Sequence, residues 1–234
     1  MKILGIDSSA KSASVAVVEN GKILSSFFIN TGLTHSQTLM PMIEDTLKCS
    51  NISLDEIELI AVNKGPGSFT GVRIGVAAAK GIADTKKIKC VGISTLESMA
   101  YNLLPFNCIA CAVMDARCSQ VYSTLFEITE GQVKRLEDDV AISISQLEEK
   151  LKDYSKPIIF VGDGADLCYN TIGKNNENTG LAFEAYKYQN AVGVCLAAQN
   201  YDASQFTDSF ELVPEYLRLP QAERELKNKL KKGE

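Results

Sequence analysis

Residues 64–81 place the strongest constraint on how this chain can fold. The stretch reads KGPGSFTGVRIGVAAAKG, and it begins as a glycine turn and continues as a run of small residues with helical character. The apolar run at residues 59–63 precedes it and is typical of a buried strand. The predicted local order is therefore a strand, a tight glycine turn and a helix.

A glycine turn before a helix can bind phosphate, because free backbone N–H groups and the helix dipole both favour an anion there. The spacing of these glycines matches neither common motif, however. A P-loop requires Gly-x-x-x-x-Gly-Lys-Ser/Thr, and Gly71 comes one residue too late for the dinucleotide fingerprint Gly-x-Gly-x-x-Gly. Phosphate binding is therefore the lesser interpretation of this turn.

The helix after the turn has one face of very small side chains. Gly71 and Gly75 lie four residues apart, and Ala78 and Ala79 follow close to the same face. A glycine inside a helix costs roughly 1 kcal/mol relative to alanine, and close packing usually offsets that cost. We expect this face to be a docking surface, for another part of the chain or for a partner.

The composition is that of a globular protein with one large or two small domains. The 234 residues are 45% hydrophobic and 23% charged, which argues against disorder. The chain reaches Asp7 too early for a signal peptide, and no apolar run could span a bilayer, so we expect a cytoplasmic protein without membrane contact. The net charge of -5 predicts no strong direct binding to nucleic acid.

The sequence has few residues suited to metal binding or to histidine-based catalysis. The seven cysteines are scattered through apolar or helical contexts and are predicted to be reduced, structural thiols. His35 is the single histidine, and it is interpreted as a surface or capping residue. A histidine-rich metal site or a histidine-based triad is therefore disfavoured, and no metal site is predicted.

Turn and capping signals divide the first hundred residues into a regular series. Runs at residues 2–7, 12–18 and 23–29 predict three antiparallel strands, the last two joined at Asn20-Gly21. Thr34 and Gln37 form a predicted capping box that begins a helix to about residue 48. There follow a second box at 53–56, the strand at 59–63, the glycine-rich helix, a strand at 88–93 and a helix at 94–104. The order is β-β-β-α-β-α-β-α.

The same order begins again after residue 104. The predicted elements are strands at 108–114, 119–126 and 158–161, a helix capped by the box at 145–148, a helix from 163 and a last helix at 191–201. The repeat is one of element order rather than of residues. The predicted domains are an N-terminal half at 1–104 and a C-terminal half at 105–213. Residues 214–234 are expected to hold a C-terminal helix that packs back on the N-terminal half.

Two such halves, each opening on a strand that ends in aspartate, resemble the α/β fold class of actin, hexokinase and the heat-shock chaperone ATPases. Within that class, five motifs resemble the TsaB family, also called YeaZ, over essentially the whole chain. They are residues 7–9 (DSS), 35–41 (HSQTLMP), 65–75 (GPGSFTGVRIG), 115–117 (DAR) and 214–218 (PEYLR). The glycine block is the most specific of the five.

The resemblance implies a bacterial accessory protein for making threonylcarbamoyladenosine, the modified base next to the anticodon in tRNAs that read codons beginning with A. In that family the protein pairs with its catalytic relative TsaD, the ATPase TsaE joins them, and a separate enzyme of the TsaC type supplies the threonylcarbamoyl-adenylate donor. The resemblance thus implies that this chain activates TsaD, meets tRNA only through the complex and forms a self-dimer when alone.

The residues themselves favour a non-catalytic role. The catalytic relative carries a His-x-x-x-His metal pair just after the strand that follows the glycine-rich helix, and Thr95 and Met99 stand at the matching places. Neither side chain can replace imidazole at an iron or zinc site. We therefore expect no catalytic residues in this chain.

The partner surface is predicted on the helices at residues 34–48 and 69–83. The resemblance implies that these helices form a bundle with like helices of TsaD or of a second copy. The predicted contact residues are Leu39, Met40, Ile43, Phe69, Gly71, Val72, Gly75, Ala78 and Ala79.

The alternative function is a nucleotide-binding ATPase or kinase of the same fold class. In that class an aspartate ending the first strand helps to hold magnesium on nucleotide phosphates, so Asp7, Ser8 and Ser9 are the candidate nucleotide-binding residues. The plainer interpretation is that they end a strand and cap its turn. No cofactor is predicted for this chain alone, and ATP or ADP stays open at the partner interface. A peptidase is disfavoured, because the chain has one histidine and no metal pair.

Overall fold

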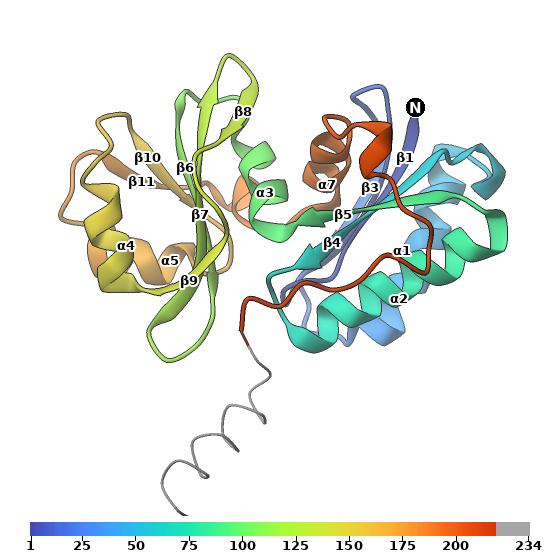
Figure 1. The fold of residues 1–234 in the computed structure, drawn as a ribbon, viewed down its shortest axis with the longest axis horizontal. Helices are drawn as coiled ribbons and strands as arrows, with labels where there is room; N and C mark the ends of the chain where they lie inside the picture. The colour runs from blue at the N-terminus through green and yellow to red at the C-terminus, as the bar shows by residue number, and fades with distance from the viewer. Residues whose placement is uncertain (219–234) are drawn as a thin grey trace, which may run out of the picture.

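The computed structural model describes residues 1–218, which form two α/β halves side by side (Figure 1). The first half opens with the antiparallel strands β1 (Lys2–Asp7), β2 (Ala13–Glu19) and β3 (Lys22–Ile29). There follow α1 (His35–Ser50), a 3-10 turn (Leu54–Glu56), β4 (Leu59–Gly65), α2 (Phe69–Lys86), β5 (Lys89–Ser94), α3 (Thr95–Ala100) and a 3-10 turn (Tyr101–Leu103). The strand order of its sheet is β3-β2-β1-β4-β5, with β4 parallel to both β1 and β5.

The second half repeats this plan with a broken third strand. Its elements are β6 (Cys108–Asp115), β7 (Gln120–Thr129), β8 (Gln132–Arg135), β9 (Val140–Ser143), α4 (Ile144–Leu151), β10 (Ile158–Val161), α5 (Ala165–Cys168), a π-helical turn (Tyr169–Gly173), β11 (Thr179–Leu181), α6 (Glu184–Lys187), α7 (Ala191–Ala198) and a 3-10 turn (Ala203–Gln205). The sheet order is β11-β10-β6-β7-β8. Strand β8 pairs with the end of β7 and β9 with its beginning, so the two together stand where the repeated element order has a single third strand.

The topology confirms the predicted fold class. In each half a central strand ending in aspartate, β1 with Asp7 or β6 with Asp115, has an antiparallel hairpin on one side and parallel strands on the other. This duplicated arrangement is that of the actin, hexokinase and heat-shock chaperone class. Asp115 and Ser9, which stands two residues after Asp7, both line the space between the two halves.

The two halves exchange helices. Helix α3 follows the first sheet in sequence, but Leu96 and Met99 pack in the core of the second sheet. Helix α7 follows the second sheet, and Val194 and Cys195 pack against the first. A Cβ on Gly193 would lie 2.2 Å from the carbonyl oxygen of Ser98, so the backbones of α3 and α7 approach very closely. The boundary after residue 104 therefore separates the two sheets but not the helices that cover them.

The predicted start of α1 is confirmed, and that of α4 is wrong by two residues. Thr34 is the N-cap of α1, but its side chain does not make the predicted capping bond, because its hydroxyl donates to Oε1 of Gln37 instead (2.8 Å). Helix α4 begins at Ile144, and its capping box is Ser143 with Gln146 rather than the box at 145–148. The predicted box at 53–56 is present. Serines stand at both 143 and 145, so sequence alone did not select the cap of α4.

The seven cysteines all lie in the described residues and form no disulfide. Five of them are buried, and only Cys49 and Cys118 are exposed. The predicted helix beyond residue 218 lies outside the described residues. Glu215 and Tyr216, ahead of it, contact the N-terminal half. None of the helices in residues 1–218 is long and apolar enough to cross a membrane.

Candidate functional site

The turn from β4 into α2 is shaped by close backbone contacts with distant parts of the chain. A Cβ on Gly65, whose φ is +120°, would lie 2.3 Å from the carbonyl oxygen of Glu215. A Cβ on Gly67 would lie 2.3 Å from the carbonyl oxygen of Ser9, and the amide of Ser68 donates to that same oxygen (2.6 Å). The glycines of this turn therefore make room for the protein's own backbone.

The glycine face of α2 contacts Ser8. The Ser8 hydroxyl donates to the carbonyl oxygen of Gly71 (2.8 Å), and a Cβ on Gly71 would lie 2.1 Å from the carbonyl oxygen of Ser8. A Cβ on Gly75 would lie 2.5 Å from the Ser8 hydroxyl oxygen. At these two positions the docking expected from the sequence takes place within the chain, because the loop after β1 lies on this face.

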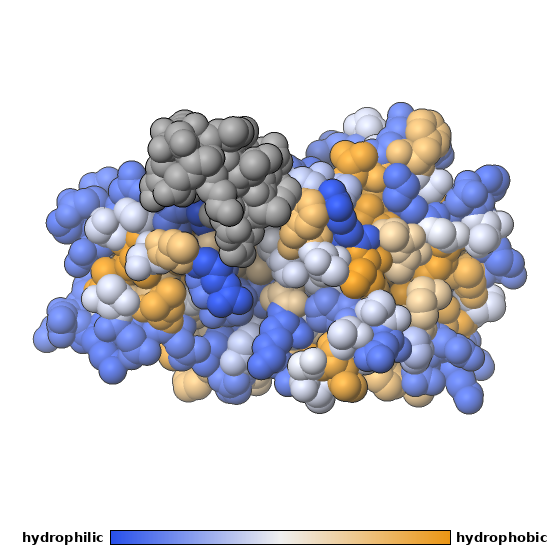
Figure 2. Space-filling view, turned by 90° about the horizontal axis from the view of Figure 1, so that it is seen from below, coloured by the Kyte–Doolittle hydropathy of each residue, from blue (hydrophilic) through white to orange (hydrophobic). Residues whose placement is uncertain are grey.

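The other residues of the predicted partner surface divide into a buried and an accessible set. The buried set packs between α1, α2 and the first sheet and comprises Leu39, Ile43, Val72 and Ala79. Met40 is 51% exposed, and Phe69 and Ala78 are partly exposed. Two further residues, Ala77 and Gly81, are exposed on the outer side of α2 and were not predicted as part of the partner surface. They lie four residues apart and so on one face of the helix, and this spacing could have identified them from the sequence. Figure 2 shows apolar residues gathered in patches over this half.

Asp7 is fully buried and does not face solvent. Its Oδ1 accepts hydrogen bonds from the amide and hydroxyl of Ser9 (3.1 and 2.6 Å) and from Nδ2 of Asn63 (2.8 Å). Burial raises the pKa of this carboxyl, and those hydrogen bonds oppose the rise. Of the three candidate nucleotide-binding residues, Asp7 holds the end of β1, Ser8 contacts α2, and only Ser9 lines the cleft described below.

His35 connects α1 to the turn between β1 and β2. Its Nε2 lies 2.7 Å from the carbonyl oxygen of Ala10. Because a carbonyl only accepts hydrogen bonds, we assign the proton to Nε2. His35 is the first residue of α1 rather than its cap, and it is only partly exposed.

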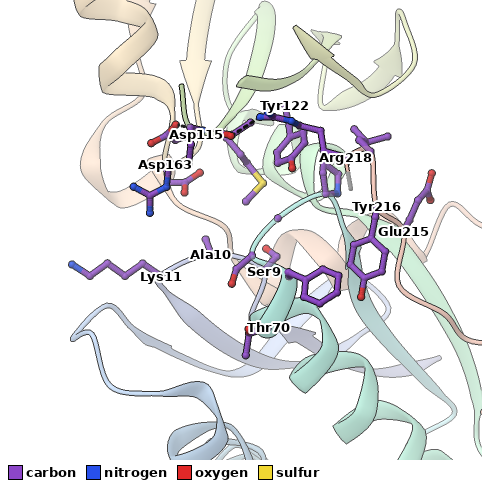
Figure 3. Close-up of a pocket in the computed structure, with 18 residues that line it drawn as sticks. Ser9, Ala10, Lys11, Thr70, Asp115, Tyr122, Asp163, Glu215, Tyr216 and Arg218 are labelled. Carbon is purple, nitrogen blue, oxygen red and sulfur yellow. Dashed lines mark hydrogen bonds between the residues drawn. The ribbon is translucent and has the colours of Figure 1, made fainter. Parts of the chain in front are cut away.

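A cleft of about 570 Å³ lies between the two halves (Figure 3). The first half contributes the turn after β1 and the start of α2, the second half contributes the ends of β6 and β10, and residues 215–218 complete the wall. Figure 3 shows Asp115 and Asp163 near each other, across from Ser9 and Thr70. The charged side chains of the wall are Lys11, Arg117, Arg218, Asp115, Asp163 and Glu215.

Among the titratable groups of the cleft wall, the Asp163 carboxyl has the clearest pKa shift. Its side chain is open to solvent, but the surrounding walls desolvate it and raise its pKa to about 6. A hydrogen bond from Nε2 of Gln189 (3.0 Å) opposes this rise, and the nearby charge of Asp115 adds to it. The carboxyl therefore changes charge near pH 6 rather than near pH 4.

The positions that match the metal pair of the catalytic relative lie in the core. Thr95 and Met99 are both fully buried in α3, and Met99 packs among the apolar side chains under the second sheet. Within residues 1–218, no three His, Cys, Asp or Glu side chains are grouped so that they could hold a metal ion.

Comparison with known proteins places these features in a family. The family model described as TsaD, tRNA N6-adenosine threonylcarbamoyltransferase, matches residues 29–226. The TsaB protein of Bacillus subtilis, named a tRNA threonylcarbamoyladenosine biosynthesis protein, is 30% identical over 224 residues, which are 95% of this chain and 96% of that protein. The chain belongs to the TsaB family.

The TsaB fold and its relation to the transferases are both visible in further matches. YeaZ from Pseudomonas aeruginosa is 22% identical, and it superposes with a TM-score of 0.75 over 92% of this chain and 99% of its own. A tRNA N6-adenosine threonylcarbamoyltransferase of Dehalococcoides mccartyi (strain CBDB1) is 33% identical over 117 residues, which are 43% of this chain and 36% of that enzyme. This match therefore covers less than half of the present chain.

Proposed function

We propose that this chain is a non-catalytic partner of TsaD in the transfer of threonylcarbamoyl to the adenosine next to the anticodon of tRNAs. The observation that carries the proposal is the position of Thr95 and Met99. They stand where the resemblance puts the metal-binding histidines of the catalytic relative, and both are fully buried with side chains that are unsuitable ligands for iron or zinc. The full-length match to TsaB of Bacillus subtilis supports the same role.

The proposed surface for TsaD is the outer side of α1 and α2. It consists of Met40, Phe69, Ala77, Ala78 and Gly81, which are exposed or partly exposed. Small side chains on α2 allow another helix to approach closely, so a bundle with like helices is the geometry that suits this surface. A self-dimer through the same surface would compete with the TsaD complex in proportion to concentration. TsaE joins the pair in this proposal, and tRNA meets the chain only within the assembly, in the cytoplasm.

Reconstituted transfer of threonylcarbamoyl to tRNA tests this function. Purified TsaD, TsaE and the donor-forming enzyme are assayed with tRNA, with and without this chain. We expect that tRNA is modified only when this chain is present, or that its modification is then at least tenfold faster. Equal rates in both reactions would reject the accessory role, and activity of this chain without TsaD would reject the non-catalytic one.

Nucleotide binding is the second candidate function, and the interdomain cleft is the observation that favours it. The cleft is large enough for a small molecule, and Lys11 and Arg117 are cations that could meet phosphate there. The burial of Asp7 counts against it, because this carboxyl would have to come out of the core to hold magnesium. Calorimetry with ATP and ADP, on the chain alone and with TsaD, decides whether nucleotide binds either form.

A further inference from the structure

Residues 214–218, here named the strap, cross from the first half of the molecule to the second. On the first half the amide of Glu215 donates to the carbonyl oxygen of Lys64 (2.7 Å), and its carboxylate pairs with Nζ of the same lysine (2.8 Å). Gly65 lies under this contact, and its missing side chain allows the two backbones to meet. The beginning of the strap is therefore attached by its backbone as well as by charge.

Tyr216 continues this attachment on the first turn of α2. Its ring centroid lies 4.7 Å from that of Phe69, and its hydroxyl accepts a hydrogen bond from Nε of Arg73 (2.8 Å). The Arg73 guanidinium lies 3.8 Å from the centre of the Phe69 ring. The ring stacking and the cation–π contact stabilise the attachment of the strap to the first half.

Arg218 makes the contact with the second half. Its NH1 donates to the carbonyl oxygen of Ala116 (2.6 Å), in the turn between β6 and β7. Three residues of that turn, Arg117, Cys118 and Ser119, have positive φ angles of 68°, 55° and 53°. Non-glycine residues adopt this conformation at a cost, and they keep it where neighbouring contacts impose it. Arg218 binds the carbonyl oxygen of the residue that directly precedes these three.

We propose that the strap is a gate on the interdomain cleft. Residues 215–218 form part of the cleft wall, so displacing them widens the opening of the cleft to solvent. The strap is attached more strongly to the first half than to the second. A backbone hydrogen bond, an ion pair and a ring stack attach it to the first half, and the Arg218 hydrogen bond attaches it to the second. The strap therefore opens by releasing Arg218 from Ala116, while Glu215 and Tyr216 act as its hinge. This proposal does not depend on the identity of a partner.

A tryptophan placed in the cleft reports its opening. The chain contains no tryptophan, so Tyr122→Trp puts a single indole in the cleft wall. In that background Arg218→Ala is expected to raise the acrylamide quenching constant at least twofold, and Tyr216→Ala to raise it as well. The control is Lys89→Ala, which removes an exposed ion pair with Asp208, ahead of the strap and outside the cleft. It should leave quenching unchanged.

Hydrogen exchange provides an independent measurement without the tryptophan. A hydrogen bond from a charged donor is worth about a tenfold change in population. Arg218→Ala should therefore speed exchange about tenfold in the turn between β6 and β7 and leave β10 unchanged. Unchanged quenching and exchange in both strap variants would overturn the proposal. So would equal increases in the Lys89→Ala control, because they would indicate general loosening of the fold.

Discussion

Ser8 and Gly71 are in direct contact, through a hydrogen bond of 2.8 Å from the serine hydroxyl to the glycine carbonyl oxygen. This contact joins the end of β1 to the start of α2, and it explains why α2 keeps glycines that weaken a helix. The helix loses intrinsic stability at these positions, and the fold recovers it through the close approach of the loop after β1.

Gly71→Ala should destabilise the protein, by about 1–3 kcal/mol, because the new methyl group would overlap the Ser8 carbonyl. The matched control is Gly81→Ala in the same helix, where nothing lies within 4 Å of the added Cβ. That change should stabilise the protein by about 0.4–1 kcal/mol. Urea unfolding of both variants measures the difference, and equal stabilities would contradict the packing described.

Ala77→Arg should weaken association with TsaD at least tenfold, because it places a large charged side chain on the proposed helix contact. Ala77 is exposed, so the free protein should keep its fold and stability. Ala203→Arg, on another exposed helical turn, is the control and should bind as the parent does. Titration by calorimetry gives the Kd. Unaltered affinity for the Ala77→Arg protein would exclude this face.

Asp163 should make the protein less stable as the pH rises towards neutrality. Its pKa in the folded state, about 6, lies above the ordinary value of 3.8 expected in the unfolded chain. Its contribution is therefore fully present below about pH 4, and it is lost as the pH rises through about 6. Asp163→Asn should flatten this part of the stability profile in urea unfolding between pH 4 and 7. The control is Asp153→Asn, at an exposed carboxyl outside the cleft, and a profile equal to the parent's in the Asp163 variant would contradict the assignment.

Two thiols should react rapidly with Ellman's reagent at pH 8 in the native protein, and all seven after unfolding. Cys49 and Cys118 are exposed, and the other five are buried. Burial raises the pKa of Cys108 to about 11 and of Cys168 to about 12, which disfavours the reactive thiolate. Replacing Cys49 and Cys118 by serine should abolish the fast phase. Rapid reaction of further thiols in that variant would show that the core opens readily.

The element order was predictable because its signals are local. The Asn20-Gly21 turn, the apolar strands and the box at 53–56 each act through neighbours in sequence, and the structure has them where they were expected. The capping residue of α4 was not predictable. Ser143 and Ser145 can both begin a helix there, and the surrounding structure selects Ser143.

The glycine block shows where sequence stops and tertiary structure decides. The sequence alone predicted that residues 71 and 75 approach other atoms closely, since close packing usually offsets the cost of a glycine in a helix. The sequence also indicated the family, through motifs spread along the chain. Only the fold decided that Ser8 makes that approach, that α3 and α7 each cover the sheet of the other half, and that residues 215–218 close one side of the cleft. These contacts join residues far apart in the chain, and their geometry depends on how the two sheets pack, which no local pattern records.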